Sequence, residues 1–161
     1  MQRASSLKLW SFFLTALGVV LADQLSKFGI RSNLLVGQSL FEVGFFQITR
    51  VPPNTGAAFG LFQDHSFALT IVAIIVAGLL LLYAFIIRRQ LLPLGGRLAG
   101  IALGLVLGGT IGNLVDRLLF GGVTDFISVG WWPAFNIADS SVVVGVILFA
   151  YSLLRLARKH G

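Results

Sequence analysis

The sequence has 161 residues, of which only 11% are charged, whereas a soluble domain carries roughly 25%, and its mean hydropathy is +0.92. The net charge of +6 could suggest a nucleic-acid partner, but most basic residues flank long apolar runs. The charge therefore indicates membrane orientation instead. There is no cysteine, which excludes disulfides and thiol nucleophiles. We expect an integral membrane protein.

The apolar runs predict four membrane-spanning helices in one domain, residues 1–161. A helix needs about 20 apolar residues to cross the bilayer core. The run at 67–87 meets this length alone, while two later runs need some polar residues at their ends. We expect spans at about 9–30, 67–87, 98–117 and 137–155. The fold class is an all-α four-helix bundle with outer loops at about 31–65 and 118–136.

The first span could instead be a cleaved signal peptide, because it has a basic start and an apolar run. The apolar pattern continues past Asp23 through Leu25, Phe28 and Ile30, which favours an uncleaved helix.

Charge asymmetry predicts the orientation of the four spans. One side carries eight of the twelve basic residues, namely Arg3, Lys8, Arg88, Arg89, Arg97, Arg155, Arg158 and Lys159. The positive-inside rule makes that side cytoplasmic. The other side carries all six acids, namely Asp23, Glu42, Asp64, Asp116, Asp125 and Asp139. We expect both termini in the cytoplasm and the acidic chemistry at the outer face.

The first outer loop contains a strand-like segment. Phe41, Val43 and Phe45 alternate with Glu42 and Gly44, a pattern typical of a strand with one apolar face. Two prolines and the sequence Asn-Thr-Gly at 54–56 then predict a turn. We expect a small β-sheet in this loop, lying on the membrane surface.

The third span carries glycine at every fourth position, at Gly100, Gly104, Gly108 and Gly112. Small residues at this spacing allow close helix contact in lipid. The repeat predicts either a packing seam within the chain or a dimer contact, and the polar helix end favours the former.

Polar residues gather at the outer ends of the third and fourth spans. Gly109, Asn113 and Asp116, with neighbouring Arg117, share one side of a helix. Counted at 1.5 Å per residue from the basic ends, Asp116 and Asp139 lie close to the outer interface. Ionisable groups at that depth are costly and usually functional.

Asn136 and Asp139 also fit a helix N-cap with an acid three residues later, a capping box. Asp125 could be an ordinary solvated loop acid. However, Trp131 and Trp132 lie between the two aspartates, and such residues anchor at the membrane interface.

Two carboxylates in one poorly solvated site share a proton, because both cannot ionise easily. One can then activate water while the other protonates the leaving group. The pair Asp125 and Asp139 therefore predicts an aspartic peptidase without a metal or cofactor. The helix dipole favours Asp139 as the ionised member.

Other chemistries have less support. Lys27 could form a dyad with Ser26, Ser140 or Ser141, but its spacing from Asp23 favours a structural ion pair. The two histidines lack metal-ligand spacing, and no phosphate-binding loop is present.

Two functions that are not enzymatic remain as alternatives. One is a small proton-coupled carrier that uses Asp116, Asp125 and Asp139 as a relay. Its weakness is that no internal repeat or acid near the midplane is visible. The other is a structural membrane subunit.

Five segments resemble the ordered motifs of the lipoprotein signal peptidase (signal peptidase II) family: DQLSK at 23–27, NTGAAFG at 54–60, GGTIGNLVDR at 108–117, VTDF at 123–126 and FNIADS at 135–140. The resemblance implies a bacterial aspartic endopeptidase of the inner membrane with Asp125 and Asp139 as its catalytic residues. It implies substrate contacts from Asn54, Gly109, Asn113, Arg117 and Asn136. Supporting positions are Asp23, Lys27, Gly56 and Asp116.

The implied substrate is a prolipoprotein, cut just before a diacylglyceryl-modified cysteine. Membrane lipids and peptide-like inhibitors such as globomycin are the other implied partners, with no nucleic acid. Two features depart from the family pattern: Ser26 replaces the usual threonine, and the segment between Asp125 and Asp139 is short.

Overall fold

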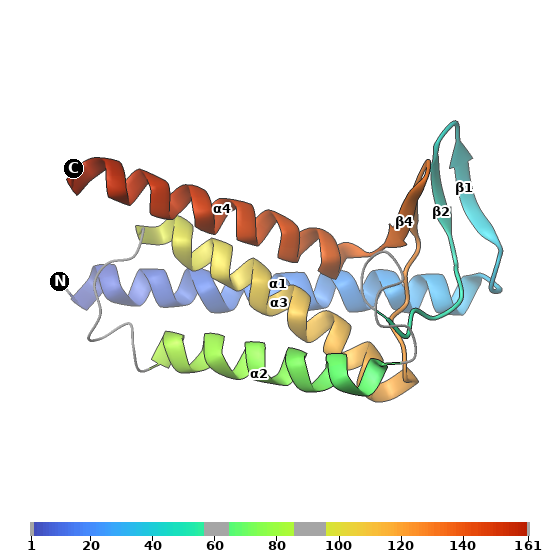
Figure 1. Ribbon diagram of the computed structural model, residues 1–161, viewed down its shortest axis with the longest axis horizontal. Coiled ribbons are helices and arrows are strands. Elements are labelled where there is room, and N and C mark those ends of the chain that lie inside the picture. The colour runs from blue at the N-terminus through green and yellow to red at the C-terminus, as the bar shows by residue number, and fades with distance from the viewer. Residues whose placement is uncertain (1, 57–64, 86–95, 161) are drawn as a thin grey trace.

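The computed structural model describes residues 2–56, 65–85 and 96–160. Its helices are α1 (Gln2–Asn33), α2 (Ser66–Phe85), α3 (Gly96–Phe120) and α4 (Ile137–His160). They run side by side, with a small sheet at one end and both termini at the other (Figure 1). All four are long and apolar enough to cross a membrane, as the sequence predicted.

The distribution of polar and apolar side chains is typical of a membrane protein. Asp23, Lys27 and Asp116 are fully buried, whereas Phe67 and Leu25 are 78% and 69% exposed. Exposed large apolar side chains occur on every helix. In lipid this arrangement is favourable, because polar groups must be satisfied within the protein.

Helix α3 lies at the centre of the bundle and packs against the other three helices. Its glycines make this contact close. A Cβ at Gly108 would lie 2.7 Å from the carbonyl oxygen of Ala16 in α1. Gly104 and Gly112 face the same helix, at Phe12 and Asp23. The glycine repeat is therefore a packing seam within the chain.

The sheet has four antiparallel strands in the order β1 (Ser39–Val43), β2 (Phe46–Thr49), β3 (Ile127–Val129) and β4 (Trp132–Phe135). The sequence prediction placed the sheet in the first outer loop alone. That prediction was incomplete, since β3 and β4 come from the loop between α3 and α4. The sheet therefore joins the two outer loops, and the segment that follows α3 is held beside the one that follows α1.

Both hairpins use the same turn. Val43 pairs with Phe46, and Val129 pairs with Trp132, so each turn has two residues. The first turn residue is Gly44 or Gly130, with φ of 58° and 54°. Two-residue hairpins need such positive φ values, which glycine adopts without strain. Phe45, expected in a strand, therefore lies in the first turn.

Candidate active site

The two candidate aspartates lie where the sheet meets the helices. Asp125 occupies the segment between α3 and β3, and Asp139 lies in the first turn of α4. Asn136 connects them: its Nδ2 donates to Asp125 Oδ1 at 2.7 Å, and its Oδ1 accepts from the Asp139 backbone N–H at 2.9 Å. One fully buried amide thus fixes both residues in a common site.

The start of α4 is a capping box, as the sequence predicted. The Asn136 side chain accepts from the Asp139 backbone, and the Asn136 N–H donates to Asp139 Oδ2 at 3.2 Å. The box satisfies N–H groups at the helix start. It also fixes the direction in which the Asp139 carboxylate points.

Asn113 on α3 supports Asp139 from the other side. Its Nδ2 donates to Asp139 Oδ1 at 2.7 Å. Its Oδ1 accepts from Lys27 Nζ at 2.9 Å and from Asn136 Nδ2 at 3.1 Å. Because two donors face the Asn113 oxygen, the amide nitrogen must face Asp139. Lys27 thereby helps to set the orientation of the amide that contacts Asp139.

Asn54 has the corresponding role for Asp125. Its Nδ2 donates to Asp125 Oδ2 at 3.0 Å, and its Oδ1 accepts from the Gly56 N–H at 2.9 Å. Its backbone pairs with Val123 through two hydrogen bonds of 2.8 Å. The turn predicted at 54–56 is therefore attached to the segment that carries Asp125.

A network of buried charged side chains on α1 and α3 lies next to the two candidate aspartates. Lys27 contacts Asp23 at 2.8 Å and Asp116 at 3.6 Å, and Asp116 also pairs with Arg31 at 3.1 Å. The expected Asp23–Lys27 ion pair is therefore present.

The two carboxylates of this network hold the backbone next to the candidate aspartates. Asp116 Oδ2 accepts from the N–H of Thr124, and Asp23 Oδ1 accepts from the N–H of Ala138, at 2.8 and 3.0 Å. Each bond is made by the residue that precedes a candidate aspartate. The sequence analysis did not identify Thr124 or Arg31 as parts of this network, because no spacing pattern pointed to them.

Arg117 lies near the pair with an unused donor. Its Nη2 donates to the Gly56 carbonyl at 3.4 Å, and it is within electrostatic reach of Asp125 and Asp139. Its Nε is buried and has no hydrogen-bond partner within the described residues. An unsatisfied buried donor is rare and costly, so this one is a candidate contact for a bound carbonyl.

Gly109 lies where α3 and α4 approach each other closely. A Cβ at this position would meet the carbonyl oxygen of Ala138 and lie 2.8 Å from Val142 Cγ2. Gly109 therefore allows α4 to approach α3, which brings Asn113 within reach of Asp139.

The electrostatics of Asp125 suit acid–base chemistry. Burial, and next the negative charge of Asp139, raise the pKa of Asp125 to about 6. Hydrogen bonds from Asn54 and Asn136 act in the opposite direction. A carboxyl group with this pKa exchanges protons near neutral pH, as general acid–base catalysis requires.

The alternative nucleophiles are engaged elsewhere. Ser26, Ser140 and Ser141 each donate to a backbone carbonyl, at 2.8, 3.0 and 2.8 Å respectively. The Lys27 ammonium contacts Asp23, Asp116 and Asn113. The geometry therefore gives no support to a serine–lysine dyad. Among the described residues, no group of three or more acidic or histidine side chains is close enough together to hold a metal ion.

The family model described as signal peptidase (SPase) II matches residues 15–155. The chain belongs to the signal peptidase II family. A lipoprotein signal peptidase of Dehalococcoides mccartyi is 54% identical over 136 residues, or 84% of each chain. Another, from Moorella thermoacetica, is 43% identical over 93% of this chain and 97% of its own. The chain is accordingly an aspartic-type peptidase, and family membership does not support the carrier alternative.

Two solved structures share the fold. Both are described as bacterial membrane enzymes, determined by the in meso method. The first has a TM-score of 0.76 and 36% sequence identity, over 89% of this chain and 87% of the other. The second has a TM-score of 0.73 and 35% identity, over 89% and 92%. This signal peptidase II is thus a multi-pass membrane protein that removes signal peptides from prolipoproteins.

Proposed function

We propose that Asp125 and Asp139 are the catalytic pair of this signal peptidase II. The observation that carries the proposal is the shared contact with Asn136, which hydrogen-bonds to both residues at 2.7 and 2.9 Å. The separate supports from Asn54 and Asn113 then hold each carboxyl group in place.

In this mechanism Asp139 is the base and Asp125 is the acid. Asp139 takes a proton from water as the water oxygen attacks the scissile carbonyl carbon. Asp125, whose raised pKa favours its protonated form, then gives its proton to the departing amide nitrogen. The C–N bond breaks, and the proton taken up by Asp139 restores the shared proton of the pair.

Arg117 and the amides around the pair position the substrate. The buried Arg117 Nε, without a partner in the described structure, would donate to a peptide carbonyl near the scissile bond. Asn54, Asn113 and Asn136 primarily orient the aspartates. Gly109 would act indirectly, through the closeness of α3 and α4.

The site lies at the outer face of the bacterial cytoplasmic membrane. The described acids cluster near the sheet, whereas Arg97, Arg155 and Arg158 lie toward the opposite end of their helices. By the positive-inside rule the latter end, with both termini, is cytoplasmic.

The substrate is a prolipoprotein whose cysteine carries diacylglycerol, and cleavage occurs on the N-terminal side of that cysteine. Two acyl chains anchor such a cysteine at the interface, since each buried methylene contributes about 0.8 kcal/mol. The lipid would thus hold the scissile bond at the depth of the aspartates. Peptide-like inhibitors such as globomycin would occupy the same site.

The test compares one precursor with and without its diacylglyceryl group, in the same bilayer and with the same enzyme. We expect the lipidated precursor to be cleaved much faster. Equal rates would contradict the lipid-anchored substrate and leave a general membrane aspartic peptidase.

A further inference from the structure

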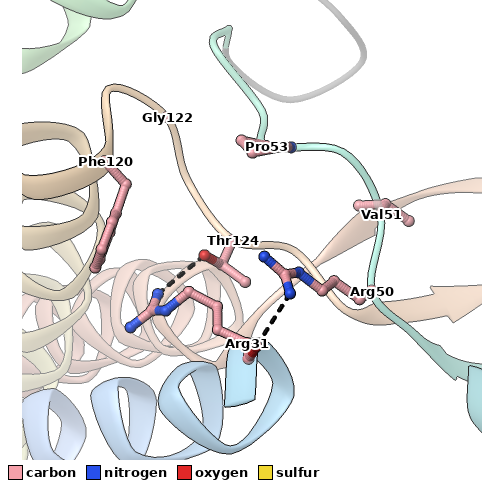
Figure 2. Close-up of a pocket in the computed structure, with 7 residues that line it drawn as sticks. All are labelled: Arg31, Arg50, Val51, Pro53, Phe120, Gly122 and Thr124. Carbon is pink, nitrogen blue, oxygen red and sulfur yellow. Dashed lines mark hydrogen bonds between the residues drawn. The ribbon is translucent and has the colours of Figure 1, made fainter. Parts of the chain in front are cut away.

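A second site lies outside the aspartate pair, between the end of α1 and the segment after β2. It is a cavity of about 220 Å³, lined by Arg31, Arg50, Val51, Pro53, Phe120, Gly122 and Thr124. The guanidinium groups of Arg31 and Arg50 approach it from different elements, with Thr124 between them (Figure 2). Neither arginine belongs to the motifs that carry the family resemblance.

Each arginine is held by one nitrogen and leaves others unused. Arg31 Nη1 donates to Asp116 Oδ1 at 3.1 Å and to Thr124 Oγ1 at 3.0 Å. Arg50 Nη1 donates to the carbonyls of Arg31 and Leu34, at 3.0 and 2.7 Å. Within the described residues, Nε and Nη2 of both side chains make no further hydrogen bond, and neither is a buried atom without a partner, so these groups are open to solvent or to a ligand. The cavity thus has two arginines that are each fixed by one nitrogen and have further donors open.

Two of the residues that line the cavity are positively charged, Arg31 and Arg50, and none of the lining residues is acidic. Arg31 pairs with Asp116 at 3.1 Å. Arg50 has no acidic partner in the part of the chain that the structure describes. Arg50 therefore brings to the cavity a positive charge that no described carboxylate pairs with.

The surroundings favour an anion that belongs to a lipid. Arg31 and Phe120 lie at the ends of helices long enough to span the membrane, the level at which headgroups are found. Phe120 lies under the Arg31 guanidinium at 4.4 Å and is 53% exposed. Leu118 and Leu119 are also exposed on the same helix end. A lipid bound by its phosphate could place its acyl chains against these side chains.

We propose that this cavity binds the headgroup phosphate of an anionic phospholipid through Arg31 and Arg50. Guanidinium groups present paired donors that match phosphate oxygens. The cavity is smaller than the roughly 300–1,000 Å³ pockets of drug-sized ligands, so it takes the phosphate and not the whole lipid. The inference does not depend on the assignment of the catalytic pair.

Arg50 also has a structural role, because it donates to the carbonyls of Arg31, in the last turn of α1, and of Leu34, just after the helix. That role uses only Nη1, and a neutral amide can also donate to a carbonyl. Arg50→Gln therefore removes the charge while retaining a donor. Arg155→Gln on exposed α4 surface toward the opposite end of the bundle is the matched control.

The experiment measures binding to the purified full-length protein in a neutral detergent, by native mass spectrometry and by the shift in unfolding temperature. The probes are dihexanoylphosphatidylglycerol, dihexanoylglycerol with the same chains but no phosphate, and inorganic phosphate. We expect the phosphatidylglycerol to bind and stabilise the protein, and the other two to have little effect. Arg50→Gln should weaken its binding about tenfold, the loss of one hydrogen bond to a charged group.

Three results would overturn the proposal. Equal binding of phosphatidylglycerol to Arg50→Gln, Arg155→Gln and the unmodified protein would exclude the arginine site. Equal stabilisation by dihexanoylglycerol would mean that the chains alone bind. Equal stabilisation by inorganic phosphate would assign the site to a free anion. If Arg50→Gln unfolds at a lower temperature without lipid, Arg50→Lys, which keeps the charge, should still bind more tightly than Arg50→Gln.

Discussion

The substitution Asn54→Ala should move the pH dependence of cleavage in a direction that the site geometry determines. Asn54 Nδ2 donates to Asp125 Oδ2 at 3.0 Å, and this bond lowers the pKa of Asp125. Removing the donor disfavours the ionised carboxylate. The pKa of Asp125 should therefore rise above its value of about 6.

The size of the shift follows from the strength of the lost bond. A hydrogen bond to a charged group contributes about 1.5–3 kcal/mol, and one pKa unit corresponds to about 1.4 kcal/mol. Asn54 is half-buried, so solvent replaces part of the loss. We expect an increase of about one pKa unit, at the low end of this range.

The assay is kcat/KM for a lipidated precursor, measured in one bilayer across the acid-to-neutral range. Asp125 must be protonated to act as the acid, so activity falls as pH rises through its pKa. This alkaline limb should lie near pH 6 in the free wild-type enzyme and about one unit higher in Asn54→Ala. A substitution that only slows cleavage would lower kcat/KM at every pH without moving the pH at which the alkaline limb falls.

The control is Asn33→Ala, which removes an exposed asparagine whose Nδ2 donates to the Gly29 carbonyl. It should leave the limb in place. A limb that stays fixed in Asn54→Ala, or that moves to lower pH, would refute Asp125 as the proton-bearing member.

Three further substitutions test the supports of the site. Lys27→Met leaves buried carboxylates without their shared cation. It should lower the free energy of unfolding, measured in one detergent, by about 3–5 kcal/mol. The double variant that also carries Asp23→Asn should be less destabilised. Gly109→Val inserts atoms against Ala138 and should cost about 1–3 kcal/mol, whereas Gly78→Val, which meets nothing within 4 Å, should be nearly neutral. Arg117→Ala should slow cleavage without lowering the unfolding temperature, and an unchanged rate would remove it from substrate binding.

The helices and the capping box could be predicted because their signals lie within single segments of the sequence. Long charge-free runs predict spans, and the spacing of Asn136 and Asp139 predicts a capping box that the structure contains. The Asp23–Lys27 pair follows in the same way from one helical turn. The capping box and the ion pair depend on neighbours within four residues, and the spans depend on continuous runs, so the sequence displays all of them directly.

The second hairpin could have been predicted but was missed. Its turn, VGWW at 129–132, repeats the VGFF of residues 43–46, where the first strand was expected. Both sequences place glycine at the position of positive φ. The strands beside the second turn are only three and four residues long, so alternation gave little signal.

The contacts that orient the aspartates could not be predicted from local pattern. Lys27 reaches Asn113 across 86 positions, and Asn54 reaches Asp125 across 71. The role of Gly109 depends on where α4 crosses α3. Such contacts result from the packing of whole helices, which spacing within one segment does not encode.

The most direct test of the account is single-turnover cleavage of a diacylglyceryl-modified precursor by Asp125→Asn and Asp139→Asn in the same bilayer. Asparagine preserves the size of the side chain and one acceptor oxygen, although its Nδ2 replaces an oxygen that accepts a hydrogen bond. It cannot ionise. Each variant should remain folded in the membrane and lose about 10²–10⁴-fold in rate, while Ser141→Ala, whose hydroxyl only donates to the Ile137 carbonyl, should cleave normally. Wild-type cleavage by either asparagine variant would contradict the assignment of the catalytic pair.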